Sequence, residues 1–250
     1  MICVLEKTHD PAVRILRLND PGSLNALSQR MLAEMSTHLS ALAHDTLCKV
    51  IVLAAQGKAF SAGHHLGQMM QDSSEETVAE LFATCSALML QIQAQPQIII
   101  AQVQGVATAA GCQLVAMCDL AVAAETARFG TTGVNLGLFC ATPAVALSRN
   151  VGRKAAMQML VTGEFISAEQ ALQFGLVNQV VRDSDLEEAS QKLATVIAQK
   201  DQEALAMGKR LFYQQLETAL PEAYRLAGSV MACNLQTQGA QTGIRRFLKI

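Results

Sequence analysis

The chain has 250 residues, 51% of them apolar, which is enough to bury the core of one large α/β domain. Its formal net charge is −2 and its 19 Lys and Arg residues are spread along the sequence, so we expect no basic surface that would hold a nucleic acid. The seven cysteines are odd in number and include no CxxC pair, which indicates reduced thiols and a reducing compartment.

Strands and helices are predicted to alternate over the first half of the chain. Residues 12–18 and the short segment 4–5 alternate apolar and polar side chains around a turn, which predicts two paired strands. Further on, the pattern predicts helices at 28–43, about 75–94 and 111–118, and strands at 50–54, 98–103 and 120–123. This alternation favours a parallel sheet.

The most apolar stretch, residues 98–124, is predicted to be buried core and not a membrane span. Gln102, Gln113 and Asp119 interrupt it, and Gly105 and Gly111 punctuate it. Beyond residue 129 the sequence becomes mostly helical. Residues 167–170 form a capping box, and three or four amphipathic helices are expected between residues 183 and 249.

Several common site motifs are missing. The sequence has no GxxxxGK[ST] loop, no GxGxxG after a strand, no HExxH and no GxSxG. His64 and His65 are neighbours in a loop, where adjacent side chains seldom converge on one ion. We therefore expect no metal site.

Two loops of small residues remain as candidate sites. Residues 58–66 follow the predicted strand 50–54, and residues 105–113 follow the strand 98–103. Small side chains let a ligand approach the backbone, and the second loop opens a helix whose unpaired N–H groups favour an oxyanion. The alternative is a pair of tight turns and a helix packed through Ala and Gly, and spacing alone leaves both interpretations open.

Five segments, residues 23–27, 58–66, 105–119, 129–137 and 160–181, occur in the order and spacing of the enoyl-CoA hydratase/isomerase (crotonase) superfamily. This resemblance covers nearly the whole chain. The amino-acid sequence of residues 107–116 and 133–140 resembles that of the subgroup of enoyl-CoA hydratase domain-containing proteins known from mitochondria.

The resemblance implies a ClpP-like α/β fold, a spiral of ββα turns followed by a helical trimerisation region. Residues 1–182 would form the spiral core with an acyl-CoA site. Residues 183–250 would form a C-terminal helical oligomerisation region that is not an independent domain. Homotrimers or dimers of trimers are expected.

The resemblance also assigns site roles. The N–H groups of His64 and Ala110 would form an oxyanion hole around the thioester oxygen. Further residues would bind coenzyme A, namely Ser23, Leu24, Ser61, Ala62, His64 and Phe247. The acyl pocket would be lined by Leu66, Gly111, Leu136 and Cys140. Coenzyme A would enter as part of the substrate, with no separate cofactor.

Both usual catalytic glutamates of the family are replaced. Gln113 and Gly133 stand at their positions. Gln cannot take a proton from water and Gly contributes no side chain, and each lost acid or base lowers the rate about 10²- to 10⁴-fold. Efficient hydration is therefore not expected. Gln113 has the alternative role of a helix residue hydrogen-bonded within the core.

Other carboxylates and one thiol are candidates to replace the two family glutamates. The family treats the Asp119 position as structural, and Glu125 lies near the same strand. Glu75, Glu76 and Glu80 fall in a segment that often covers the acyl pocket, but a solvated helix face is the simpler interpretation. Cys140 would be reactive only beside a cation or a helix N-terminus.

Three functions remain open. The first is an enoyl-CoA hydratase/isomerase-like enzyme of fatty acid metabolism that stabilises a thioester enolate with weak or relocated acid/base chemistry. The second is an acyl-CoA decarboxylase or thioester hydrolase, since the wording of residues 61–64 resembles the decarboxylating branch. The third is a non-catalytic acyl-CoA-binding scaffold. No export or import leader follows Met1, so the expected location is cytoplasmic, away from membranes.

Overall fold

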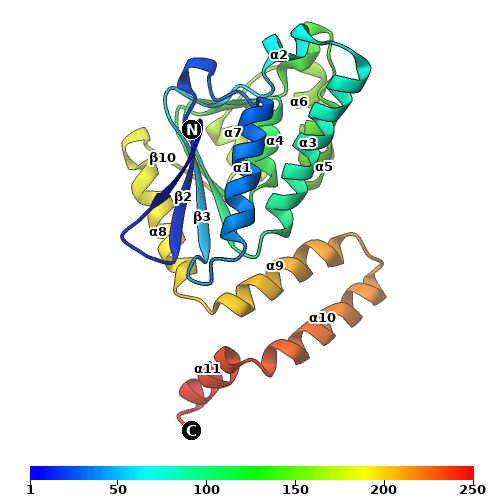
Figure 1. The fold of residues 1–250 in the computed structure, drawn as a ribbon. Coiled ribbons are helices and arrows are strands. Elements are labelled where there is room, and N and C mark those ends of the chain that lie inside the picture. Colours follow the sequence, from blue (N-terminus) through cyan, green and yellow to red (C-terminus); the bar gives the residue numbers. More distant parts are fainter.

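The main sheet has helices on both of its faces in the computed structural model, which describes residues 1–250 (Figure 1). Its order is β1-β2-β3-β5-β7-β10. The strands are β1 (Cys3–Lys7), β2 (Val13–Leu18), β3 (Val50–Ala55), β5 (Ile98–Val103), β7 (Leu120–Ala124) and β10 (Gln179–Val181). Only β1 runs antiparallel to its neighbour. The predicted hairpin and the predicted parallel sheet are both confirmed.

A second sheet of very short strands was not predicted. It has the order β4-β6-β8-β9, with β4 (Ala59–Ser61), β6 (Val106–Thr108), β8 (Arg128–Gly130) and β9 (Ile166–Ser167). The first three strands are parallel, and each follows a long strand of the main sheet. Each turn of the chain is thus a long strand, a short strand and a helix, which confirms the expected spiral.

The core has seven helices, of which α1, α3 and α4 begin and end within one residue of the predicted ranges. They are α1 (Gln29–Leu42), α2 (Leu66–Gln71), α3 (Glu75–Ala94), α4 (Ala110–Met117), α5 (Ala141–Asn150), α6 (Arg153–Thr162) and α7 (Ala168–Phe174). The hydroxyl of Ser28 caps α1, and Ser167 with Gln170 forms the predicted capping box of α7. α3 has the length and hydropathy of a membrane-spanning helix, but one side of it packs into the core.

The first helix of the C-terminal region packs on the core. α8 (Leu186–Ala198) packs against β3, β5 and β7, on the side of the main sheet away from α1 (Figure 1). The part that leaves the core begins later, with α9 (Gln202–Leu216), α10 (Leu220–Leu235) and α11 (Gln238–Leu248). We call these three helices the arm. With α8 they make four helices, which agrees with the predicted three or four.

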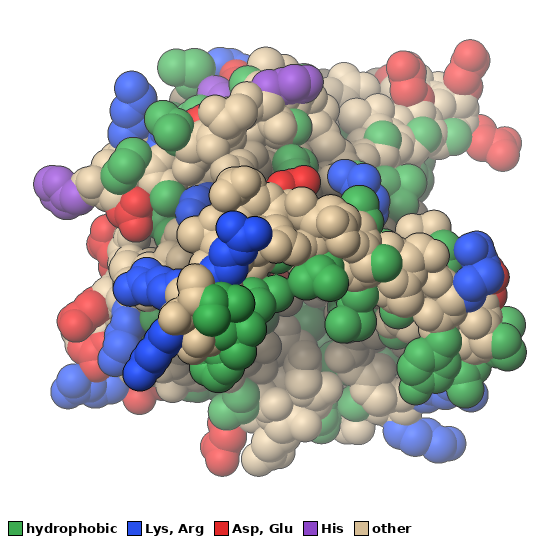
Figure 2. Space-filling model, turned by 90° about the horizontal axis from the view of Figure 1, so that it is seen from below, with side chains coloured by type: hydrophobic (Ala, Val, Ile, Leu, Met, Phe, Trp, Pro, Cys, Tyr) green, Lys and Arg blue, Asp and Glu red, His purple; other side chains and the backbone are tan.

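The arm carries many large apolar side chains at its surface. Figure 2 shows hydrophobic side chains in separate groups on the face seen from below, around a hollow. The most exposed are Phe212, Leu216, Leu220, Tyr224, Met231 and Phe247. A monomeric protein rarely leaves so much apolar surface in contact with water.

One buried ion pair fastens the arm to the core. Lys209 of α9 is 6% exposed, and its Nζ lies 2.7 Å from Oδ2 of Asp119. The ammonium also donates to the carbonyl oxygens of Ile92 and Gln97, and the Tyr213 hydroxyl donates to the other Asp119 oxygen at 2.8 Å. All three protons of the ammonium are therefore used and both carboxylate oxygens accept hydrogen bonds, as buried charges require.

Removing one member of this pair should destabilise the protein strongly. In Lys209→Met the Asp119 carboxylate stays buried without its cation, so the free energy of unfolding should fall by about 3–5 kcal/mol in a denaturant titration at fixed protein concentration. Arg149→Met is the matched control, since its ion pair with Glu217 is exposed and should contribute less than about 1 kcal/mol. Equal losses in the two variants would contradict this assignment.

Candidate active site

An apolar cavity of about 270 Å³ lies where three turns of the spiral meet. The cavity-lining residues include seven predicted site residues, Ala62, His64, Leu66, Ala110, Gly133, Leu136 and Cys140. The others are Met69, Phe82, Ala109, Thr132, Leu138, Phe139, Ala141, Thr142 and Pro143. None of these residues is an Asp, Glu, Lys or Arg.

The short sheet brings the two candidate loops together. β4 and β6 pair in parallel, with Ser61 opposite Ala107, so the segments that follow them leave the same edge of the sheet. β8 pairs with β6 in the same direction, and Thr132 and Gly133 follow it. The cavity therefore lies beyond the carboxyl ends of three parallel strands, where ligands bind in such sheets.

Contact between the loops is close enough to require glycine at position 63. Gly63 has φ +84°, and a Cβ there would lie 2.9 Å from the carbonyl oxygen of Thr108 and 3.1 Å from the backbone nitrogen of Ala110. His64, the next residue, has a main-chain N–H that donates to no acceptor in the chain. Ala110 is the first residue of α4, so its N–H lacks an acceptor within the helix. Both predicted donors thus lie at one cavity.

The backbone at the start of α4 is strained. Ala109 has φ 49° and ψ −120°, a conformation that residues with a Cβ rarely adopt, and its N–H donates to Gly130 at 2.9 Å. Such strain typically costs about 1–3 kcal/mol and clusters at functional sites. Here it sets the direction in which α4 presents its first N–H group.

Asn25 is the residue that holds the first loop, and sequence reasoning gave it no role. It is fully buried with φ 53°, and its amide nitrogen donates to the carbonyl oxygens of Gln56 and Ala59 at 2.9 and 2.8 Å. Its own carbonyl accepts from the Ser61 hydroxyl at 2.8 Å. The tolerance of Asn for a left-handed backbone was the available signal.

The residues expected to bind coenzyme A are used in different ways. The Ser61 hydroxyl is buried and bonded to Asn25, so it is not free for a ligand. The Ser23 hydroxyl donates to Asp20, and the Leu24 carbonyl accepts from the Ala62 N–H at 3.0 Å. Phe247 is 85% exposed on α11, the last helix of the arm, and does not line the cavity of its own chain (Figure 1).

The His64 side chain is half-buried beside Phe82, and both residues line the same cavity. Its Nδ1 lies 3.4 Å from the carbonyl oxygen of Leu27, and its ring stands edge-on to Phe82 with ring centroids 5.2 Å apart. Nε2 is buried and has no hydrogen-bond partner. Burial lowers the pKa of the imidazole, which is therefore neutral at neutral pH.

The positions of the family glutamates supply no carboxylate. Gln113 is 4% exposed, and its amide oxygen has no partner. Gly133 packs against Leu138 and Cys140, and a Cβ there would lie 2.8 Å from the Cys140 sulfur. Burial raises the pKa of the Cys140 thiol, so this thiol is protonated at neutral pH.

The other predicted carboxylates lie elsewhere. Asp119 belongs to the ion pair with Lys209, which agrees with a structural role. Glu75, Glu76 and Glu80 are exposed on α3, and Glu125 is exposed after β7. No cluster of three or more His, Cys, Asp or Glu side chains is arranged to hold a metal ion. Gly111 is buried against Ser61 and does not line the cavity.

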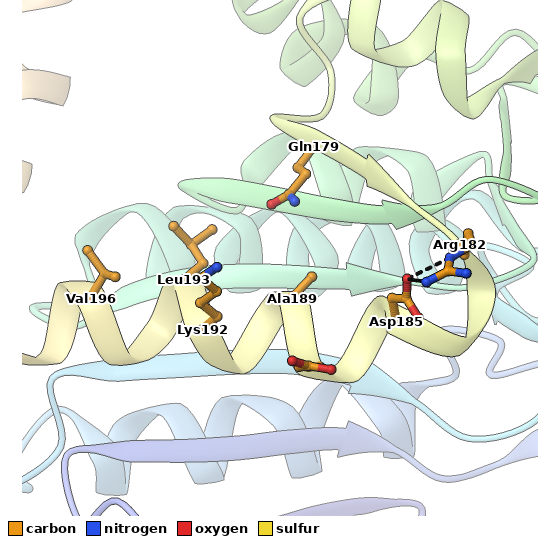
Figure 3. A pocket seen from close by; sticks show the side chains of 8 residues that line it. Gln179, Arg182, Asp185, Ala189, Lys192, Leu193 and Val196 are labelled. Carbon is orange, nitrogen blue, oxygen red and sulfur yellow. Dashed lines mark hydrogen bonds and ion pairs between the residues drawn. The ribbon is translucent and has the colours of Figure 1, made fainter.

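A larger cavity, of about 560 Å³, lies beside β10 and α8 and contains none of the predicted site residues (Figure 3). Its charged groups are largely neutralised by one another, since Arg182 is paired with Asp185 at 2.7 Å. We therefore assign the active site to the smaller, apolar cavity.

The spiral of ββα turns and the cavity at its strand ends define an α/β protein of the crotonase type. The chain belongs to the enoyl-CoA hydratase/isomerase family, whose model matches residues 8–249. It is 43% identical to the mitochondrial enoyl-CoA hydratase domain-containing protein 3 of Xenopus laevis over 99% of this chain and 84% of that protein.

Two solved structures are similar over the whole chain. One is an enoyl-CoA hydratase of Mycobacterium smegmatis, with TM-score 0.98, 50% identity and 96% of that chain covered. The other is human enoyl-CoA hydratase domain-containing protein 3, with TM-score 0.96, 41% identity and 98% of that chain covered. The resemblance to this subgroup is thereby confirmed.

The expected cytoplasmic location is wrong. The relatives from Xenopus, rat and human, at 43–45% identity, are named as mitochondrial proteins, which points to mitochondria and not to the cytoplasm. The expectation rested on the residues after Met1 and on reduced cysteines. Reduced thiols fit any reducing compartment, so they did not discriminate between the two.

The close packing of Gly133 gives a stability prediction. Gly133→Ala should lower the free energy of unfolding by about 1–3 kcal/mol, because the new Cβ collides with Leu138 and Cys140. Gly208→Ala is the control, since a Cβ there meets nothing within 4 Å in α9, and it should stabilise by up to about 1 kcal/mol. Denaturant titration measures both, and a neutral Gly133→Ala would show that the loop has room for a side chain.

Proposed function

We propose that the chain binds an acyl-CoA thioester in the apolar cavity and polarises its carbonyl with the main-chain N–H groups of His64 and Ala110. The observation that carries this proposal is the close approach of Gly63 to the start of α4, where an added Cβ would lie 3.1 Å from the Ala110 nitrogen, with His64 and Ala110 both lining one cavity. Neither group has an acceptor that a ligand would need to displace.

The surroundings suit a negative charge on the thioester oxygen. The N-terminus of α4 carries the positive end of the helix dipole, and no carboxylate lines the cavity to oppose it. In an apolar cavity that excludes water, fixed N–H donors are worth more than in water. An enolate formed from the thioester would be stabilised there. Coenzyme A would enter as part of the substrate, and no separate cofactor would be needed.

The chemistry that follows differs from ordinary hydration. Adding water across a double bond needs a base for the water and an acid for the carbon, and neither carboxylate is present. An enolate-forming reaction of the hydratase/isomerase type that needs fewer proton carriers fits this cavity better. Decarboxylation of a malonyl-type thioester is the second candidate, because loss of CO₂ yields the enolate without any base.

The proposed donor at Ala110 is testable with proline, which removes an N–H yet is tolerated at the first position of a helix. Ala110→Pro should weaken binding of crotonyl-CoA in calorimetry, and it should lower any turnover about 10²- to 10³-fold because one oxyanion donor is lost. Substrates to assay are crotonyl-, methylmalonyl- and longer acyl-CoA thioesters, with enoyl absorbance and released CO₂ as readouts.

Arg153→Pro is the matched control, because Arg153 is exposed at the first position of α6 and lies outside the cavity. It should bind and turn over like the parent protein. Equal binding by the parent and by folded Ala110→Pro would refute the donor role. Tight binding with no turnover of any thioester would instead leave a scaffold function.

We also propose that the arm joins copies of this chain into a trimer or a dimer of trimers. The large apolar side chains on α9, α10 and α11 are exposed and do not pack against the core of their own chain. The buried ion pair of Lys209 attaches only α9 to that core. Phe247 would then serve a cavity of a neighbouring copy, since it lies far from its own. Burial of such side chains typically contributes about 1.5–3 kcal/mol each.

A charge placed in this apolar surface should oppose assembly. The double variant Tyr224→Glu with Met231→Glu should have a smaller molar mass than the parent in size-exclusion chromatography with light scattering. The reason is that two exposed apolar side chains of α10 become charged. Leu172→Glu, on α7 of the core and outside the arm, should leave the mass unchanged. A parent protein that is monomeric at high concentration would contradict the assembly.

A further inference from the structure

Met69 of α2 lies between two cavities. It is one of the residues that line the apolar cavity of about 270 Å³, and it also lines a second cavity of about 210 Å³. No other residue lines both. The second cavity is bounded by the first residue of α1, by α2 with the residue that follows it, and by the first two turns of α3. Met69 therefore separates the proposed acyl site from this second space.

No other apolar side chain of α2 would replace Met69 as a wall. α2 contains no buried residue, and both Leu66 and Met70 are exposed. Met69 is half-buried, and among the apolar side chains of α2 it alone packs against the hydrophobic core. The partition is thus one side chain thick, and methionine is an unbranched, flexible side chain. Shortening this one residue should join the two cavities.

The size of the first cavity limits the acyl chain that it holds. A protein cavity of about 150 Å³ accommodates one benzene ring. At the same density the first cavity holds about ten carbon atoms, and the second adds space for about eight. The carbons of a longer chain would have to pass Met69 or remain in water.

The second cavity is more polar than the first and carries one charge. Val78 and Leu81 of α3 give it an apolar side, whereas most of its other side chains are amides. Its one charged group is Asp72, whose Oδ1 accepts from the Ser74 N–H at 3.1 Å and whose Oδ2 accepts from the Thr77 hydroxyl at 2.8 Å. These hydrogen bonds lower the pKa of Asp72, so its carboxylate is ionised at neutral pH. A chain end that enters this cavity therefore has to be free of negative charge.

We propose that Met69 determines the length of acyl chain that the site accepts, by closing the first cavity against the second. This inference rests on the proposed function, because it needs the thioester carbonyl at the N–H groups of His64 and Ala110. The ligand class is an acyl-CoA with an unbranched, uncharged chain of up to about ten carbons. Methylenes beyond that length add no affinity, because the partition keeps them in water.

Calorimetry with saturated acyl-CoA thioesters, from butyryl-CoA to tetradecanoyl-CoA, tests the partition. Affinity of the parent should rise about fourfold with each methylene that is buried and should level off near ten carbons, roughly the capacity of the first cavity. Met69→Ala should bind tetradecanoyl-CoA at least about tenfold more tightly than the parent does, because the end of the chain gains the second cavity. Hexanoyl-CoA should bind both proteins equally. Tetradecanedioyl-CoA, whose chain ends in a carboxylate, should gain nothing from the substitution.

Met70→Ala is the matched control, since Met70 is the next residue of α2, is 76% exposed and lines neither cavity. It should keep the chain-length limit of the parent. The double variant Met69→Ala with Val78→Phe fills the second cavity and should restore that limit, which a merely loosened α2 would not do. If Met69→Ala does not fold, Met69→Phe provides the second test, because it keeps an apolar contact with the core. Its larger ring should weaken binding of decanoyl-CoA about tenfold and leave butyryl-CoA unaffected.

Two results would overturn the inference, namely parent affinity that still rises up to tetradecanoyl-CoA, and an unchanged limit in folded Met69→Ala or Met69→Phe. An equal gain for the dicarboxylate chain would overturn the uncharged ligand class. Binding of hexanoyl-CoA in those cases would leave the proposed thioester site intact. A parent protein that binds no acyl-CoA of any length would instead refute the proposed function itself.

Discussion

The buried amide of Asn25 is the constraint on which the geometry of the site depends. It joins the segment before α1 to the carbonyl oxygens of Gln56 and Ala59, on either side of the turn between β3 and β4. The Ser61 hydroxyl donates a hydrogen bond to the main-chain carbonyl of Asn25 and accepts one from the Gly63 N–H at 3.3 Å. Because these atoms are buried, each lost bond leaves an unsatisfied polar group. The course of the main chain up to His64 is therefore fixed by buried side chains whose hydrogen bonds stay within the chain.

Most of the side chains that line the cavity are apolar, and none is charged. Gly133 leaves room for the loop of Leu138 and Cys140 to fold inward, and this packing occupies the space that a longer side chain would need. The cavity has no carboxylate, and at position 133 it has no space for one.

Much of the fold could be predicted from the sequence because its long elements have strong periodicity. The bounds of α3 and β5 agree with the predicted 75–94 and 98–103. The second sheet escaped prediction because strands of two or three residues, such as Ile166–Ser167, are too short to show alternation. Family motifs predicted Ala110 and Gly133 at the cavity, but a motif carries no information on side-chain direction. The buried Ser61 hydroxyl, the free nitrogen of His64 and the role of Asn25 therefore emerged only with the coordinates.

The N–H groups at positions 64 and 110 belong to the main chain, and this has an evolutionary consequence. Any amino acid except proline provides the same donor, so mutation at these two positions leaves the donors in place while it replaces the side chain. New reactivity can then be sampled on an unchanged anion-binding frame.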